Sequence, residues 1–261
     1  IECSEMSKKY LGEQIDIHAG GEDLVFPHHE NEIAQSEAAN GKEFAKYWMH
    51  NAFLNIDNRK MSKSLGNFRT VREISKQYDL QVLRFFMLSA HYRSPLNFSA
   101  DLMEASKSGL TCIVNAADNL KFLMGNAKTE GMRAEEAEAY EKTQEYVKAF
   151  ESAMEDDFNT ADAAAAVFDL VKYSNTTADA GSSKEFLQKL LDRLVSLTDV
   201  LGLIVDRKEE MLDGEIEKLI EERQAARKAK DFARADAIRD ELLEKGINLK
   251  DTREGVQWKR A

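Results

Sequence analysis

Proline and cysteine are both scarce in this sequence of 261 residues. Its prolines are Pro27 and Pro95, so no proline interrupts the second half of the chain, and we expect long helices after residue 100. Its two cysteines, Cys3 and Cys112, are too few for a disulfide framework. Low cysteine content is typical of a reducing compartment, and we expect a cytoplasmic protein.

Long hydrophobic runs and an excess of positive charge are also missing. No apolar run approaches about 18 residues, which excludes a membrane-spanning helix, and we expect no signal peptide. Lysine and arginine total 36 against 47 acidic residues, giving a net charge of −11. An acidic chain is a poor general binder of nucleic acid, so any RNA contact must use a local basic patch.

The hydrophobic content of 43% is ample for buried cores, in one large domain or roughly two to three small ones. The sequence begins with Ile1 and not with methionine, directly beside a motif residue. We therefore expect the chain to be a piece of a longer protein.

A pair of lysines marks the first motif. Residues 60–64 read Lys-Met-Ser-Lys-Ser and are followed by Leu-Gly-Asn. A strand-like apolar run at residues 52–56 precedes this stretch, and a capping box of Thr70 and Glu73 predicts a helix after it. Such a loop can close positive charge onto a polyphosphate. The simpler interpretation is a solvated basic loop.

All five histidines lie within the first 91 residues. Residues 14–18 are expected to form a strand, and Pro27 is placed to begin the next helix. On that helix His28 and Glu32 are four residues apart and share a face. Such a pair is more often a surface hydrogen-bond pair than a metal site. With Cys3 it makes three of the four ligands that tetrahedral zinc accepts.

These stretches together resemble a known family. The pentapeptide at residues 60–64 is similar to the signature loop of class I aminoacyl-tRNA synthetases. Residues 16–23 (Asp-Ile-His-Ala-Gly-Gly-Glu-Asp), residues 26–32 (Phe-Pro-His-His-Glu-Asn-Glu) and the Ile-Glu-Cys at residues 1–3 resemble the second half of the catalytic domain of cysteinyl-tRNA synthetases. The resemblance continues to the C-terminus.

The resemblance implies an enzyme that activates cysteine with ATP and Mg²⁺ and passes the cysteinyl group to the terminal ribose of tRNA(Cys), working as a monomer when intact. Lys60 and Lys63 would be the catalytic residues, stabilising charge on ATP. The residues that match the family's ATP-binding positions are Gly21, Asp23, Ser62, Lys63 and Ser64. Asp23 would bind the ribose, although it could simply favour a helix N-terminus. The isolated chain would be inactive, because the family's His-Ile-Gly-His-like element is absent from it.

The resemblance also implies one zinc ion, which would read the thiol of the substrate, because zinc strongly prefers a thiolate over a hydroxyl. Cys3, His28 and Glu32 match the family's ligands, and a fourth would come from an N-terminal part that is absent here. His18 would line the same pocket, or act only as a hydrogen-bond donor at the end of a strand.

The expected fold is mostly α-helical with an α/β start. Residues 1–70 would be the second half of a class I Rossmann-like catalytic domain, and residues 71–100 a helical connector near the acceptor stem of the tRNA. Hydrophobic residues at three- and four-residue steps predict an antiparallel helical bundle over residues 101–205, with Cys112 in its core. Residues 206–213 read as a linker, and residues 214–261 as a small helix-hairpin unit.

The C-terminal unit is the less acidic end of the chain, with 12 basic against 11 acidic residues in residues 214–261. Its basic residues surround Phe232, a composition that suits single-stranded RNA. A charged helix surface packed through Phe232 is the alternative. By resemblance, Arg227, Phe232 and Asp236 match the family's anticodon-recognition positions.

Two other functions fit part of this pattern. A ligase of the same ancestry that joins cysteine to an amino-sugar, as in mycothiol synthesis, would share the lysine loop but would have no use for an anticodon unit. An RNA- and zinc-binding module without activity of its own is the second alternative. The unit at residues 214–261 argues against the first alternative but not against the second.

Overall fold

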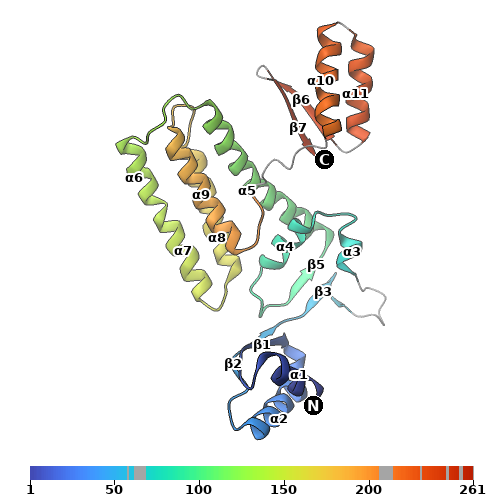
Figure 1. Ribbon diagram of the computed structural model, residues 1–261, viewed down its shortest axis with the longest axis vertical. Helices are drawn as coiled ribbons and strands as arrows, with labels where there is room; N and C mark the ends of the chain where they lie inside the picture. Colours follow the sequence, from blue (N-terminus) through green and yellow to red (C-terminus); the bar gives the residue numbers. More distant parts are fainter. Residues whose placement is uncertain are drawn as a thin grey trace. The chain divides into compact units, whose positions relative to one another are not determined.

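The computed structural model describes residues 1–57, 59–61, 69–205, 214–229, 231–244, 247–252 and 255–260. The chain divides into two compact units, Ile1–Asp206 and Arg207–Ala261. Most of the described residues are helical, with short strands near the start and at the end (Figure 1). Within the described residues, no helix is long and apolar enough to cross a membrane.

A small α/β lobe begins the first unit. Helix α1 (Glu2–Leu11) precedes strand β1 (Ile15–Gly21), and helix α2 (Glu30–Asn40) crosses over to strand β2 (Ala45–Asn51). The two strands pair in parallel, and such pairing requires a crossover of this kind. The core of the lobe consists of Ile15, Phe44 and Ala45, with Trp48 packed against them.

Helix α2 begins later than the sequence predicts. Pro27 was expected to be the first helical residue, but α2 starts at Glu30 after a π-type turn, Val25–His29. Phe26 is extended, with φ −127° and ψ 132°, because a residue before proline is forced out of the α region. At the other end, Gly41 terminates the helix in a left-handed conformation with φ 64°.

A second small sheet and two helices connect the lobe to the bundle. Strand β3 (Leu54–Ile56) lies between β4 (Arg59–Lys60) and β5 (Leu96–Phe98). Helix α3 (Val71–Ile74) begins with the predicted capping box of Thr70 and Glu73, and helix α4 (Leu80–Leu88) follows. The described residues thus confirm the predicted start of α3.

Five helices make up the bundle: α5 (Ala100–Asn126), α6 (Ala134–Lys142), α7 (Gln144–Glu155), α8 (Thr160–Thr177) and α9 (Lys184–Val200) (Figure 1). Helix α5 packs against α8 and α9, and α7 packs along α8. Asn159 caps α8, since its side chain accepts a hydrogen bond from Asp162 N at 3.2 Å. One continuous hydrophobic core runs through the bundle and includes α4.

Cys112 is exposed, so the prediction that it lies in the core is wrong. The buried stripe of α5 passes through Leu110, Ile113 and Leu120, and Cys112 lies beside this stripe on the solvent side. It lines an open groove together with Lys107 and other residues of α5 and Asn175 of α8.

The second unit pairs two helices with a hairpin. Helices α10 (Gly214–Lys228) and α11 (Phe232–Glu244) pack together, and strands β6 (Ile247–Thr252) and β7 (Gly255–Arg260) form the predicted antiparallel hairpin. Ile238 and Leu242 of α11 are fully buried, with Leu219, Ile220 and Leu249 packed against them. The expected linker at residues 206–213 lies outside the described residues.

Candidate metal and nucleotide site

Three histidines meet across the parallel strand pair of the first lobe. His18 lies on β1 opposite Trp48 of β2, and His50 lies opposite Gly20. His29 ends the π-type turn before α2, which brings its ring over the same end of the strands. The parallel register and the late helix start therefore place side chains from three segments in one cluster.

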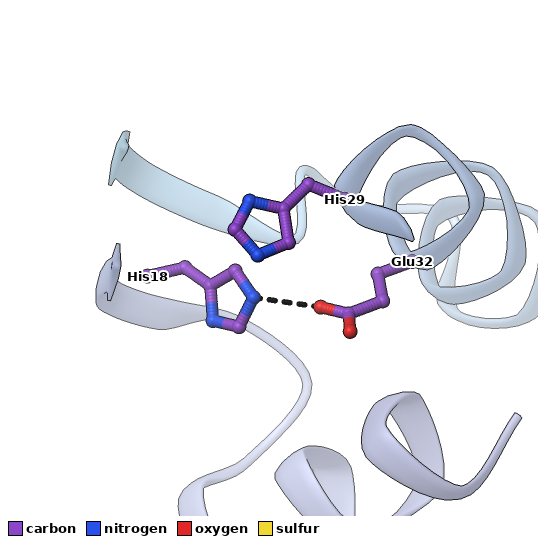
Figure 2. Close-up of side chains that lie close together, drawn as sticks. All are labelled: His18, His29 and Glu32. Atoms are coloured by element: carbon purple, nitrogen blue, oxygen red, sulfur yellow. Dashed lines mark ion pairs between the residues drawn. The ribbon is translucent and has the colours of Figure 1, made fainter. Parts of the chain in front are cut away.

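Glu32 completes this cluster from the first turn of α2. Its Oε2 lies 2.6 Å from Nε2 of His18, as an ion pair (Figure 2). Candidate ligand atoms of His18, His29 and Glu32 all lie within 4.8 Å of one another. His18 Nε2 and Glu32 Oε2 are both buried, and neither makes a hydrogen bond of acceptable geometry despite the short ion-pair distance. A short, poorly directed contact leaves both polar atoms incompletely satisfied.

The ring of His29 is buried and held in a fixed orientation. Its Nδ1 shares a hydrogen bond of 2.8 Å with Nε2 of His50, and the ring packs against Trp48 at a centroid distance of 5.2 Å. A Cβ atom on Gly20 would lie 2.8 Å from Cε1 of His29, so only glycine admits the imidazole this closely. Burial, followed by the proximity of His18, lowers the pKa of His29 below its ordinary value, since both disfavour the charged ring.

The three predicted zinc ligands do not come together in this structure. Glu32 lies in the cluster, but His28 and Cys3 are both exposed. In the part of the chain that the structure describes, His18, His29 and Glu32 form the one group with the geometry of a candidate metal site. The predicted set of Cys3, His28 and Glu32 therefore does not fit an ion in the present arrangement, and it stays a prediction.

Sequence reasoning missed His29 and His50. It placed His28 and Glu32 on one helical face, but α2 begins only at Glu30, so His28 does not follow the helical register. No role follows for His50 from the sequence, although in the structure it partners His29. The clustering of histidines near the start of the chain was the signal that could have found them.

Two of the predicted ATP-binding residues lie close together at the end of β1: Gly21 is its last residue, and Asp23 lies in the turn that follows. A Cβ atom on Gly21 would lie 2.6 Å from Oδ1 of Asp23, so the carboxylate folds closely over the glycine. Asp23 is exposed. Lys60 follows in β4, with its backbone paired to Asn55. The other predicted members of the lysine loop, namely Ser62, Lys63 and Ser64, lie outside the described residues.

The predicted anticodon-binding residues lie on α10 and α11. Arg227 is exposed in the last turn of α10, and Phe232, the first residue of α11, is 62% exposed. Asp236 is exposed one turn later, 3.4 Å from Nη1 of Arg239. Because the core of this unit is built from Ile238 and Leu242, Phe232 does not pack in it.

Three family models match successive parts of the chain. Residues 1–108 match the class I (C) tRNA synthetase catalytic domain, residues 149–205 the DALR domain, and residues 209–258 the cysteinyl-tRNA ligase anticodon binding domain. A crystal structure of the LeuRS–tRNA–LeuAMS ternary complex of Agrobacterium radiobacter K84 has a similar fold, with a TM-score of 0.57 at 17% identity. It covers 77% of this chain, which covers 29% of that one.

Curated relatives match along the whole chain. A cysteine–tRNA ligase of Lachnospira eligens is 66% identical, and one of Clostridioides difficile is 54% identical. Each match covers 100% of this chain and 55% or 56% of the relative, so the chain spans about half the length of these proteins. The successive family matches and these relatives show that the chain belongs to the cysteinyl-tRNA synthetase family.

Proposed function

We propose that this chain is part of a cysteine–tRNA ligase, which activates cysteine with ATP to cysteinyl-adenylate and then transfers the cysteinyl group to tRNA(Cys). The observation that carries the proposal is that one chain matches both a class I catalytic domain and an anticodon-binding domain of this family. Relatives that match along the whole of this chain are named cysteine–tRNA ligases. The intact enzyme is proposed to be a cytoplasmic monomer.

Charge stabilisation is the proposed role of the lysine loop. As cysteine attacks the α-phosphate, negative charge develops on the phosphate oxygens and on the departing pyrophosphate. Lys60 and Lys63 would neutralise this charge, while Ser62 and Ser64 would donate hydrogen bonds to the phosphates. Gly21 lets the nucleotide approach the backbone, and the exposed carboxylate of Asp23 accepts hydrogen bonds from ribose hydroxyls. These roles require positioning and preorganised charge, and no side-chain nucleophile.

RNA contact is the proposed role of the second unit. Phe232 offers an exposed ring on which an unpaired base can stack, and Arg227 lies at the end of the neighbouring helix. Asp236, also exposed, lies one turn later on α11 and can accept hydrogen bonds from a base edge. Such a unit explains how an acidic chain can contact RNA, because the contact is local.

The amino-sugar ligase is not favoured by these findings. Residues 209–258 match an anticodon-binding domain, which an enzyme acting on a small sugar does not need. A binding module without catalysis is also less well supported, since residues 1–108 match a catalytic domain.

An acceptor assay on the intact protein tests the proposal. Radioactive cysteine and ATP are supplied with either tRNA(Cys) or a glucosamine-based acceptor, and the labelled product is measured. We expect cysteine to be esterified to the tRNA and not joined to the amino-sugar. Transfer to the amino-sugar alone would identify the rival ligase, and no transfer to either acceptor would reject ligase activity.

A further inference from the structure

We propose that Asp157, in the turn between α7 and α8, is a positioning residue for the lysine loop at residues 60–64, and that it acts through Tyr92 and Arg93. The proposal rests on the ligase function proposed above. It adds a residue of the helical bundle to a reaction whose proposed charge-stabilising groups lie far earlier in the chain.

The turn that holds Asp157 has an unusual backbone. Asp157 and Phe158 have φ values of 55° and 56°, so two consecutive residues other than glycine adopt the left-handed conformation. Helices often end in one such residue, and glycine usually occupies that position because it has no Cβ. Other residues are strained there, and strained residues of this kind often lie at functional sites. The contacts of the Asp157 side chain are therefore expected to offset this strain.

Asp157 joins its turn to the turn that follows α4. Its Oδ1 accepts a hydrogen bond of 2.7 Å from the hydroxyl of Tyr92, and its Oδ2 lies 2.8 Å from Nε of Arg93 as an ion pair. Nε of Arg93 also donates to the Tyr92 hydroxyl at 3.0 Å, so each of the three side chains contacts the other two. A longer contact of 3.5 Å, from Oγ1 of Thr160 to Ala90 O, links the same two turns.

The turn after α4 supports the strand that leads to the lysine loop. The carbonyl of Tyr92 accepts a hydrogen bond of 2.9 Å from Ala52 N, which lies between β2 and β3. Strand β5, which follows the turn, pairs in parallel with β3. On the other side of β3, the paired strand β4 contains Lys60. A continuous series of covalent and hydrogen-bonded links therefore runs from Asp157 to the backbone of Lys60.

These contacts are better suited to positioning than to stabilising the fold. The side chains of Asp157 and Arg93 are 41% and 61% exposed, and exposed ion pairs contribute little to stability because solvent screens them. Catalysis is far more sensitive to geometry, since a misplacement of about 1 Å can slow a reaction by about 100-fold. Loss of these contacts can therefore lower the rate while leaving the melting temperature nearly unchanged.

Asp157→Gly is the variant that separates these two roles. Glycine removes the carboxylate but suits the left-handed backbone, so the melting temperature should change little. Cysteine-dependent exchange of pyrophosphate into ATP by the intact protein should slow by about 10-fold in kcat, with the KM for cysteine within about twofold of its original value. Asp156→Gly removes the neighbouring carboxylate and is the matched control, in which kcat should stay the same. An unchanged kcat in Asp157→Gly would overturn the proposal.

Tyr92→Phe tests whether Asp157 acts through this contact. The variant removes only the hydroxyl, and we expect it to lower kcat as well. If the two residues act through one contact, the double variant should be no slower than Asp157→Gly alone. Effects that multiply in the double variant would contradict the proposed route.

Hydrogen–deuterium exchange of the intact protein supplies a measurement that does not depend on activity. Peptides covering residues 52–57 should exchange faster in Asp157→Gly than in the unmodified protein, because Tyr92 O would be held less firmly against Ala52 N. Equal protection of these peptides would overturn the proposal, even if kcat is lowered. An unmodified protein that exchanges no pyrophosphate would instead reject the ligase function, and with it any role of Asp157 in that reaction.

Discussion

Glu136 is a buried carboxylate that joins the start of α6 to the start of α9. Its two oxygens accept hydrogen bonds from the backbone and side chain of Arg133, and from the N–H and hydroxyl of Ser183 at 2.8 Å. Burial alone raises the pKa of Glu136, but these hydrogen bonds outweigh it and lower the pKa from 4.5 to about 2. A lowered pKa in the folded state means that the ionised carboxylate stabilises the fold.

We predict that Glu136→Gln lowers the free energy of unfolding by about 2 to 3 kcal/mol at pH 7. The contribution of this carboxylate is fully present above pH 4.5 and is lost as the pH falls toward about 2. The difference between the variant and the unmodified chain should therefore shrink in urea unfolding at acid pH. Glu135→Gln, one residue away and exposed, is the control. A constant difference between pH 7 and pH 3 would argue against the role of the charge.

Gly202 is a second residue at which the local structure disfavours any other amino acid. It follows α9 with φ 65°, and a Cβ atom there would lie 2.4 Å from the guanidinium of Arg84. That guanidinium is fixed, because its Nε donates to Leu201 O at 2.7 Å. Leu203 and Val205 are buried just beyond this turn.

We predict that Gly202→Ala destabilises the first unit by about 1 to 2 kcal/mol, through the left-handed backbone and the displaced arginine. Gly125→Ala, in the last turn of α5 with open space around it, should instead be neutral or stabilise by up to about 1 kcal/mol. Thermal unfolding of both variants measures the contrast. Equal melting temperatures of the two variants would contradict the prediction, because they would show that Arg84 moves aside without destabilising the fold.

At the scale of the elements, local signals were predictable from the sequence and non-local ones were not. The capping box at Thr70, the cap at Asn159 and the stop at Gly41 each depend on a few adjacent residues, and all three are present. Strand β2 was missed because it is stabilised by pairing with β1, about 30 residues earlier, which local patterns do not reveal.

The cluster of His18, His29 and Glu32 likewise could not be predicted from local sequence patterns. Its residues come from β1, the turn before α2 and the helix itself, and their geometry depends on where α2 begins. The sequence indicated a histidine-rich region and the participation of Glu32. It could not indicate which of two adjacent histidines turns inward, because the extended Phe26 shifts the helix start.

Helix α11 carries the next prediction. If Phe232 stacks on an anticodon base, Phe232→Ala should weaken tRNA binding by roughly 1 to 3 kcal/mol. Because this ring is 62% exposed, the melting temperature should be unchanged. Filter binding and thermal unfolding supply the two measurements.

Arg227→Ala, on the neighbouring helix, should also weaken tRNA binding without lowering stability, because Arg227 is exposed. Normal tRNA affinity in the Phe232→Ala protein would remove the stacking role. A loss of stability in that variant would show that the ring supports the fold of the unit.

At the scale of the whole molecule, the chain combines three parts. They are a lobe that matches a class I catalytic domain, a helical bundle, and a C-terminal unit that matches an anticodon-binding domain. Parallel strands are normally covered on both faces, yet Ile17 of β1 and its neighbour Tyr47 of β2 are both exposed. Relatives are nearly twice as long as this chain, which spans 55% of the Lachnospira eligens enzyme. Activity must accordingly be measured on the intact protein.

The most direct measurement is cysteine-dependent exchange of pyrophosphate into ATP by the intact protein, compared with its Lys63→Ala variant. A single preorganised charge contact is worth about 3 to 4 kcal/mol, so the account predicts a rate lower by roughly 100- to 1,000-fold. Lys60→Ala should lower the exchange rate less than Lys63→Ala does. Phe232→Ala should leave the rate unchanged, because Phe232 lies in the C-terminal unit and not in the lysine loop. A Lys63→Ala protein that exchanges pyrophosphate within about threefold of the unmodified enzyme would contradict the proposed role of the lysine loop.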